Sequence, residues 1–231
     1  MKNNNKLLNI ISSIIKSIDD GFVGIVGPAG VGKTFFSNEI AKILNCHVYS
    51  LDFRFIGDSL FRKELLYNKL KSSIDNYIDA VNQLNWWDWI KIENDLKTLE
   101  DKKIISIKSP YERNIGKNIS DITIKHQNYT LVEGAILGDV NILKFFKKII
   151  FLHSSQERRF NNLLKKDLNK RKFNEICARF LITEYSEMLY YKKLFKLKEM
   201  DILFFDVENE NVISQPKYDD KKFIPIQFLD E

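Results

Sequence analysis

The stretch GPAGVGKT at residues 27–34 constrains the fold of this chain more than any other feature of the sequence. Its glycines allow the backbone to wrap closely and to aim N–H groups at phosphate oxygens. A helix expected to begin near Lys33 adds the positive end of its dipole. Five apolar residues at 22–26 precede the stretch, and a helical pattern at 35–44 follows it. We interpret residues 27–34, called the phosphate loop below, as the turn of a strand–loop–helix unit.

The spacing of this loop predicts the binding of a nucleoside triphosphate and magnesium. Lys33 is placed to reach the β- and γ-phosphates, and Thr34 to offer its hydroxyl to Mg²⁺. The alternative is a fortuitous glycine-rich turn, but the flanking strand and helix are the context that such a loop requires. The predicted nucleotide-binding residues are Gly27, Ala29, Gly30, Val31, Gly32, Lys33, Thr34 and Phe35.

The pattern of apolar residues predicts an α/β fold. We expect helices within residues 58–100 and 156–200, and an amphipathic helix near residues 8–18. Alternating strand and helix patterns predict a P-loop NTPase-type parallel sheet sandwiched by helices. With 231 residues, the chain fits a single domain over residues 1–231 with a charged tail at 206–231. The expected strands are residues 22–26, 47–51, 104–107, 129–132, 148–152 and 201–205.

Composition limits the location and the partners of the chain. The net charge is +5, from 36 basic and 31 acidic residues, which does not by itself indicate a nucleic-acid partner. Cys46 and Cys177 form no CxxC pair and suit a reduced compartment. The first twenty residues are too interrupted to span a membrane and lack a signal-peptide pattern. We therefore expect a cytoplasmic protein with no membrane partner, and the sequence leaves open whether copies associate.

Two carboxylates are placed near the ends of predicted strands. Asp52 follows HVYSL, and Glu133 follows YTLV. Ligands of an open parallel sheet gather beyond the carboxyl ends of its strands. Asp52 is a candidate to accept the proton of a substrate hydroxyl, and Glu133 is a candidate magnesium-associated residue. The alternatives are a capping or surface role for Asp52 and a turn role for Glu133.

A basic segment follows the fifth predicted strand. It reads HSSQERRFNNLLKKDLNKRK from His153 to Lys172. Cations that close over a moving phosphoryl group lower the barrier to transfer, and a mobile cover also excludes water. We interpret residues near 156–175 as a helical lid. A solvated helix face and a nucleic-acid patch are the alternatives.

With these motifs in order, residues 22–205 resemble the uridine kinase and phosphoribulokinase-like family of P-loop kinases. The similar segments are GPAGVGKT, LDF at 51–53, SPYER at 109–113, LVEGAIL at 131–137, FKKIIFLHSSQERR at 146–159 and MDILFF at 200–205. No segment after the phosphate loop is specific alone, and the resemblance depends on their order and spacing.

This resemblance implies roles for individual residues. Asp52 matches the catalytic aspartate of the family, and Glu133 matches its magnesium-associated glutamate. Tyr111 and Arg113 lie in the segment near the acceptor substrate. Lys166 falls among the lid cations. The predicted catalytic residues are Lys33, Asp52, Arg159 and Arg171.

The sequence departs from the family in the lid and on the acceptor side. The usual Arg-Arg pair of the lid is replaced around Asn162-Leu163, and the following Arg-Gly-Arg becomes Arg171-Lys172-Phe173. The substrate segment of the family is replaced by Asn85-Trp86-Trp87-Asp88-Trp89. We consider Asp88 a candidate to bind a sugar hydroxyl, with a tryptophan stacked on a ring. The alternative is that these tryptophans are core residues.

These observations predict an ATP-dependent, Mg²⁺-requiring kinase that phosphorylates a small metabolite with a hydroxyl group. Nucleoside-like and sugar-like acceptors fit best. One alternative is an NTP-hydrolysing switch or regulatory NTPase that acts on a protein or nucleic-acid partner. A kinase of polynucleotide 5′-hydroxyls is a third hypothesis, weakly supported by a pI of about 8.9.

Overall fold

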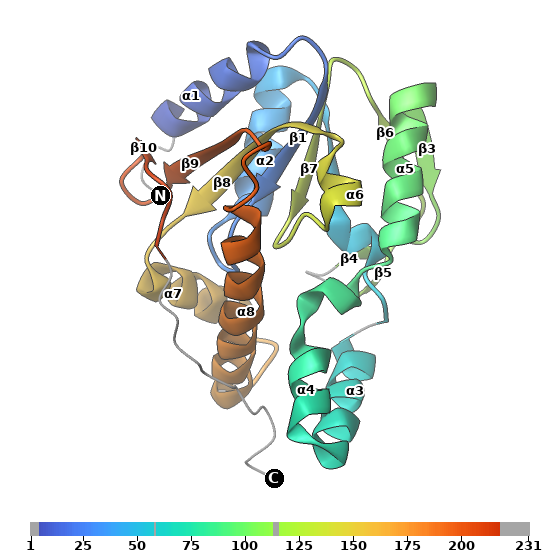
Figure 1. Cartoon of the computed structure of the whole chain (residues 1–231), viewed down its shortest axis with the longest axis vertical. Coiled ribbons are helices and arrows are strands. Elements are labelled where there is room, and N and C mark those ends of the chain that lie inside the picture. The colour runs from blue at the N-terminus through green and yellow to red at the C-terminus, as the bar shows by residue number, and fades with distance from the viewer. Residues whose placement is uncertain (1–4, 58, 113–115, 218–231) are drawn as a thin grey trace.

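A six-stranded sheet forms the centre of the computed structural model, which describes residues 5–57, 59–112 and 116–217. Its strands lie in the order β10-β9-β8-β1-β7-β2 (Figure 1). All neighbouring pairs are parallel except β10 with β9. The predicted parallel sheet is therefore confirmed, with one added antiparallel edge strand. The bounds are β1 Gly21–Val26, β2 His47–Ser50, β7 Tyr129–Gly134, β8 Phe146–His153, β9 Ile202–Asp206 and β10 Asn211–Ile213.

Helices cover both faces of this sheet. One face packs on α1 (Asn5–Lys16) and α2 (Lys33–Leu44), and the other packs on α5 (Trp89–Lys102), α6 (Val140–Leu143) and α8 (Phe173–Leu194). In β1, Val23 and Ile25 belong to the first core, whereas Phe22 and Val26 belong to the second. Strands buried on both faces need such continuous apolar runs. The helix expected near residues 8–18 is present as α1, which confirms that prediction.

The connection between β2 and β7 carries most of the structure outside the main sheet. It begins with the 3-10 turn η1 (Leu51–Arg54) and the helices α3 (Ser59–Ser72) and α4 (Ile74–Val81), which pack as a hairpin (Figure 1). A second 3-10 turn, η2 (Gln83–Trp86), leads to α5. The connection therefore supplies a wall of helices and small strands beside the end of β2.

Residues 104–107 form a strand but do not join the main sheet. β3 (Ile104–Ile107) pairs antiparallel with β6 (Ile122–Lys125), and β4 (Tyr111–Glu112) pairs antiparallel with β5 (Lys117–Asn118). The prediction of a place in the parallel sheet is wrong. The reason is that β3 is buried on one face only, with alternating exposed and buried residues, as is typical of a small antiparallel pair.

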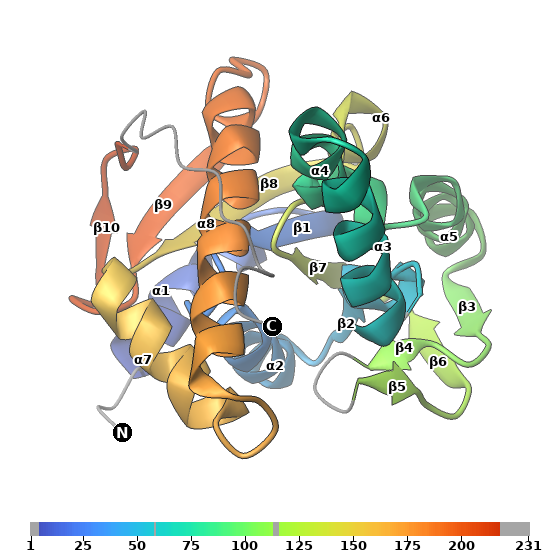
Figure 2. The same cartoon turned by 90° about the horizontal axis from the view of Figure 1, so that it is seen from below.

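Two helices follow β8. α7 (Gln156–Asp167) and α8, called the lid helices below, lie on one side of the N-terminal end of α2, and α3, β4 and β5 lie on the other (Figure 2). The chain then enters β9, which is not the last strand as expected, because β10 pairs with it. The apolar stretch of the tail at 223–229 lies outside the described residues. Among the described helices, none has the length and apolarity needed to cross a membrane.

Candidate active site

The phosphate loop joins β1 to α2 in a conformation that favours glycine at three positions. Gly27, Gly30 and Gly32 have φ values of +157°, +81° and +102°, which side-chain-bearing residues rarely adopt. A Cβ on Gly30 would also lie 2.3 Å from the carbonyl oxygen of Arg159. Lys33 Nζ donates hydrogen bonds to the carbonyl oxygens of Gly27 at 2.7 Å and Pro28 at 3.2 Å. The ammonium group is thus held at the mouth of the loop.

The lid helices contact the phosphate loop directly. Asn162 Nδ2 donates a hydrogen bond to the Gly30 carbonyl oxygen at 2.9 Å. The Ala29 backbone N–H donates to Glu187 Oε2 at 2.8 Å. Glu187 is 1% exposed, so α8 brings a buried carboxylate to a loop amide of the kind that binds phosphate. Helices α7 and α8 are therefore both attached to the phosphate loop.

Glu133 connects the phosphate loop to the end of β2. It lies within β7, rather than after it, and is 6% exposed. Ser50 Oγ donates to Glu133 Oε1 at 2.8 Å, and Thr34 Oγ1 donates to Oε2 at 3.2 Å. Burial and the neighbouring Asp52 carboxylate raise the pKa of Glu133, and Lys33 and the two hydroxyl groups partly oppose this shift. Ionisation of Glu133 therefore depends on nearby positive charge.

The same oxygens are suited to magnesium. The hydroxyl of Thr34 and the carboxylate of Glu133 meet at hydrogen-bond distance beside the phosphate loop. Mg²⁺ prefers oxygen ligands and is usually held by one or two protein groups together with water and substrate phosphates. The residues present thus fit a magnesium ion bound with a nucleotide.

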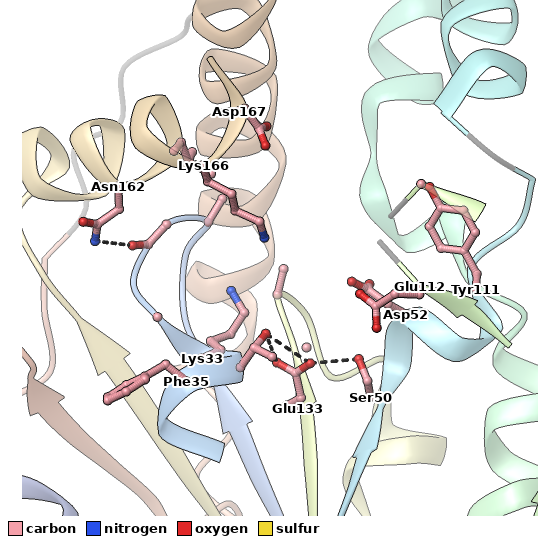
Figure 3. Close-up of a pocket in the computed structure, with 18 of the residues that line it drawn as sticks. Lys33, Phe35, Ser50, Asp52, Tyr111, Glu112, Glu133, Asn162, Lys166 and Asp167 are labelled. Carbon is pink, nitrogen blue, oxygen red and sulfur yellow. Dashed lines mark hydrogen bonds between the residues drawn. The ribbon is translucent and has the colours of Figure 1, made fainter. Parts of the chain in front are cut away.

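A cavity of about 900 Å³ extends from the phosphate loop to β4. Figure 3 shows Lys33 and Glu133 at its floor, Lys166 and Asp167 on the lid side, and Asp52, Glu112 and Tyr111 on the opposite side. The last group and Phe53 are called the acceptor end below. The cations that line the cavity come from the phosphate loop and from the lid, and they are Lys33, Lys166, Lys170, Arg171 and Arg179.

The structure brings most of the predicted site residues to this cavity. Gly27 belongs to the loop and binds Lys33 through its carbonyl oxygen, whereas Val31 is buried in the core with 3% exposure. Arg113 lies outside the described residues. Tyr111 is buried, stacks on Phe55 with ring centroids 5.8 Å apart, and lines the cavity. The predicted residues that line the cavity are Ala29, Gly30, Gly32, Lys33, Thr34, Phe35, Asp52, Tyr111, Glu133 and Arg171.

Arg159 is not brought to the cavity. It is 3% exposed and forms a buried ion pair with Glu184, which is 6% exposed. Arg159 Nη2 donates to Glu184 Oε2 at 2.9 Å, and the guanidinium group lies 5.6 Å from the centre of the Phe180 ring. This arginine therefore connects α7 to α8, and it does not line the cavity.

Asp88 is not brought to the cavity either. It caps the N-terminus of α5, where its side chain accepts a hydrogen bond from the Lys91 backbone N–H at 3.0 Å. Trp87 is 2% exposed, and Trp86 and Trp89 pack on the same core. The alternative that these tryptophans are core residues thus fits the structure.

Several residues that line the cavity or contact the phosphate loop were missed by sequence reasoning. Ser50 carried a weak signal, because it is a polar residue at the carboxyl end of a predicted strand, two positions before Asp52. Arg179 and Glu187 carried none, because both are single polar positions within the long helix α8. The missed polar residues include Ser50, Glu112, Asn162, Asp167, Arg179 and Glu187.

Comparison with known proteins supports the fold. No protein-family model matches the chain, and no curated protein sequence matches it. D-glycerate 3-kinase from Cryptococcus neoformans is similar in structure, with a TM-score of 0.61 at 8% identity over 92% of this chain and 99% of that chain. Phosphoribulokinase from Rhodobacter spheroides is similar with a TM-score of 0.55 at 11% identity, over 90% of this chain and 76% of that chain.

A third similar structure is a protein from Bacillus stearothermophilus described as a possible uridine kinase. Its TM-score is 0.56 at 16% identity, over 87% of this chain and 98% of that chain. At these identities the likeness shows the fold. The resemblance expected from the sequence is therefore confirmed at that level, and the chain has the α/β fold of the uridine kinase and phosphoribulokinase-like P-loop kinases.

Proposed function

We propose that this chain transfers the γ-phosphate of ATP, with Mg²⁺, to a hydroxyl group of a small molecule. The observation that carries the proposal is that one cavity of about 900 Å³ contains the phosphate loop, the Asp52 and Glu133 carboxylates, and the lid cations. Phosphoryl transfer needs these elements together, because its catalysis is mostly positioning and charge stabilisation.

The loop side of the cavity would hold the donor. The loop amides and Lys33 would bind the phosphates, and Thr34 and Glu133 would hold the magnesium ion. When bound, this ion would neutralise charge on the phosphate oxygens. The lid cations Lys166 and Arg171 would face the same phosphates from above and exclude water from them.

The acceptor end would hold the substrate. Asp52 lies in η1, directly after β2, and lines the cavity. We infer that the acceptor hydroxyl attacks the γ-phosphorus, that the bond to the leaving ADP oxygen breaks, and that Asp52 takes the hydroxyl proton. Phe53 and Tyr111 add ring surfaces, and Glu112 adds a second carboxylate that can accept hydrogen bonds. These groups fit a nucleoside-like or sugar-like acceptor.

An NTP-hydrolysing switch remains the alternative function. The cavity favours a kinase, because it extends past the phosphate loop to Tyr111 and Glu112 and thus offers space for a second substrate. The three structural neighbours are described as small-molecule kinases, which supports the same choice.

A substitution of Asp52 tests the proposal. ADP release is measured with ATP and Mg²⁺ over a panel of nucleosides, sugars and polyols, for the unchanged chain and for Asp52→Asn. We expect an acceptor that stimulates ADP release, and a loss of about 10²-fold or more in Asp52→Asn at nearly unchanged ATP affinity. Asp101→Asn, on the exposed end of α5, is the matched control and should behave like the unchanged chain. The proposal would be contradicted if ATP hydrolysis were equal in the unchanged chain and in Asp52→Asn and if no acceptor of the panel stimulated it.

A further inference from the structure

Helix α8 contributes a cation to the cavity that no motif of the sequence indicates. Arg179 lines the cavity together with Lys166, Lys170 and Arg171. It lies in the second turn of α8, eight residues before Glu187, which binds the Ala29 amide. Residues at this spacing lie on one face of a helix. The face of α8 that reaches the phosphate loop therefore also carries Arg179.

A shared carboxylate holds Arg179 beside Arg171. Arg171 Nη1 and Arg179 Nη1 each donate to Asp167 Oδ2 at 3.1 Å. Asp167 is 9% exposed and lies at the C-terminal end of α7, and the Arg179 side chain is 32% exposed. One carboxylate thus gathers two guanidinium groups at the wall of the cavity.

We propose that Arg179 contacts the terminal phosphates of the bound nucleotide and that Asp167 positions it together with Arg171. This inference rests on the proposed transfer reaction, because it assigns Arg179 to the same phosphates. Guanidinium groups bind phosphate through paired, charge-assisted hydrogen bonds. A polyphosphate offers several charged oxygens, whereas Asp167 offers one carboxylate that the two arginines share, and both arginines line the cavity.

Nucleotide affinity tests this role without knowledge of the acceptor. Dissociation constants of ATP, ADP and AMP with Mg²⁺ are measured by calorimetry for the unchanged chain and for Arg179→Gln. We expect the dissociation constant of ATP to rise about tenfold or more in the variant, because a hydrogen bond to a charged phosphate is lost. The dissociation constant of AMP should change by less than about twofold, because AMP lacks the terminal phosphates that Arg179 would contact. Lys193→Gln, which removes an exposed cation from the other end of α8, is the control and should bind all three nucleotides normally.

A second pair of variants tests the role of Asp167. We expect Arg179→Gln to weaken ATP binding by less than about threefold when Asp167→Asn is already present, because Arg179 without its positioning carboxylate already contributes less to ATP binding. A purely structural carboxylate would leave the two effects independent. Arg179→Lys keeps the positive charge but loses the paired N–H groups of the guanidinium. Its ATP affinity should lie between those of the unchanged chain and Arg179→Gln, and it replaces Arg179→Gln in the test if that variant unfolds.

The outcomes separate this inference from the proposed function. Equal binding of ATP in Arg179→Gln and the unchanged chain, or an equal loss for ATP, ADP and AMP, would overturn the role of Arg179. A selective loss of ATP affinity would support it even if no acceptor stimulated ADP release, in which case the proposed transferase activity alone would fail.

Discussion

Replacement of Arg159 distinguishes a structural role from a catalytic one. The buried ion pair with Glu184 joins the lid helices, and both side chains are less than a tenth exposed. Removal of one partner of a buried ion pair leaves the other charge without compensation and costs about 3–5 kcal/mol. The total stability of a domain is about 5–15 kcal/mol, so the loss is a large fraction of it. We therefore expect Arg159→Met to lower the free energy of unfolding by about 3–5 kcal/mol.

Urea denaturation followed by circular dichroism measures this change. Methionine keeps most of the aliphatic stem of the side chain and removes the guanidinium group, which pairs with Glu184 and lies 5.6 Å from the centre of the Phe180 ring, so the loss reports mainly the charged group rather than a cavity. The double variant Arg159→Met/Glu184→Leu should recover most of the stability, because a well-packed apolar pair replaces a buried ion pair at little or no cost. Lys165→Met, on the exposed side of α7, is the control and should change stability by less than about 0.5 kcal/mol.

The same variants decide where Arg159 acts. The structure predicts that the double variant binds ATP with nearly normal affinity, because neither side chain lines the cavity. A stable Arg159→Met protein that loses less than about 1 kcal/mol but most of its ATP affinity would refute this reasoning. It would return Arg159 to the phosphate-binding role expected from the sequence.

Two further predictions concern the floor of the cavity. Burial and the Asp52 carboxylate raise the pKa of Glu133, so its ionised form destabilises the folded chain at neutral pH. Glu133→Gln should therefore raise the free energy of unfolding at pH 7.5, and this gain should vanish below the ordinary glutamate pKa of about 4.3. The same variant should weaken the dependence of nucleotide binding on Mg²⁺. Urea titrations at several pH values measure the stability change, and a lower free energy of unfolding in Glu133→Gln at pH 7.5 would contradict this reasoning. Gly30→Ala should cost about 2 kcal/mol or more and abolish ATP binding, because a Cβ would lie 2.3 Å from the Arg159 carbonyl oxygen at a φ of +81°. Gly116→Ala is the control for backbone strain, because Gly116 has a φ of +76° and no atom lies within 4 Å of the added Cβ. If both variants changed ATP binding equally, the result would count against a role for close packing at Gly30.

Local patterns predicted the central fold well. The phosphate loop, the strand before it and the helix after it depend on a few neighbouring residues, and all three are present. The apolar runs at residues 129–132 and 148–152 are strands buried between helices, so their sequences report that burial, and the run at 201–205 forms most of β9, in which only Phe205 is fully buried. Residues 104–107 have a similar apolar composition but are covered on one face only, and their pairing with β6 depended on a connection that the pattern does not specify.

The acceptor side was predicted less well for the same reason. Asp88 and the tryptophans beside it looked suited to a sugar site, but packing of α5 on the core places Asp88 at a helix N-terminus. Tyr111 reached the cavity because β4 lies beside η1, a contact between segments far apart in the sequence. Such contacts depend on how whole elements pack, which local spacing does not reveal.

The sequence by itself predicted a phosphate-binding loop at residues 27–34, because the spacing of glycines, lysine and threonine acts within a single turn. Only the tertiary structure decided which cations of the basic region line the cavity beside that loop. Arg159 and Arg171 look alike in the sequence, yet one is paired with Glu184 across 25 residues and the other lines the cavity with Arg179. The direction of a side chain on a helix depends on what the opposite face packs against, and that is a property of the assembled fold.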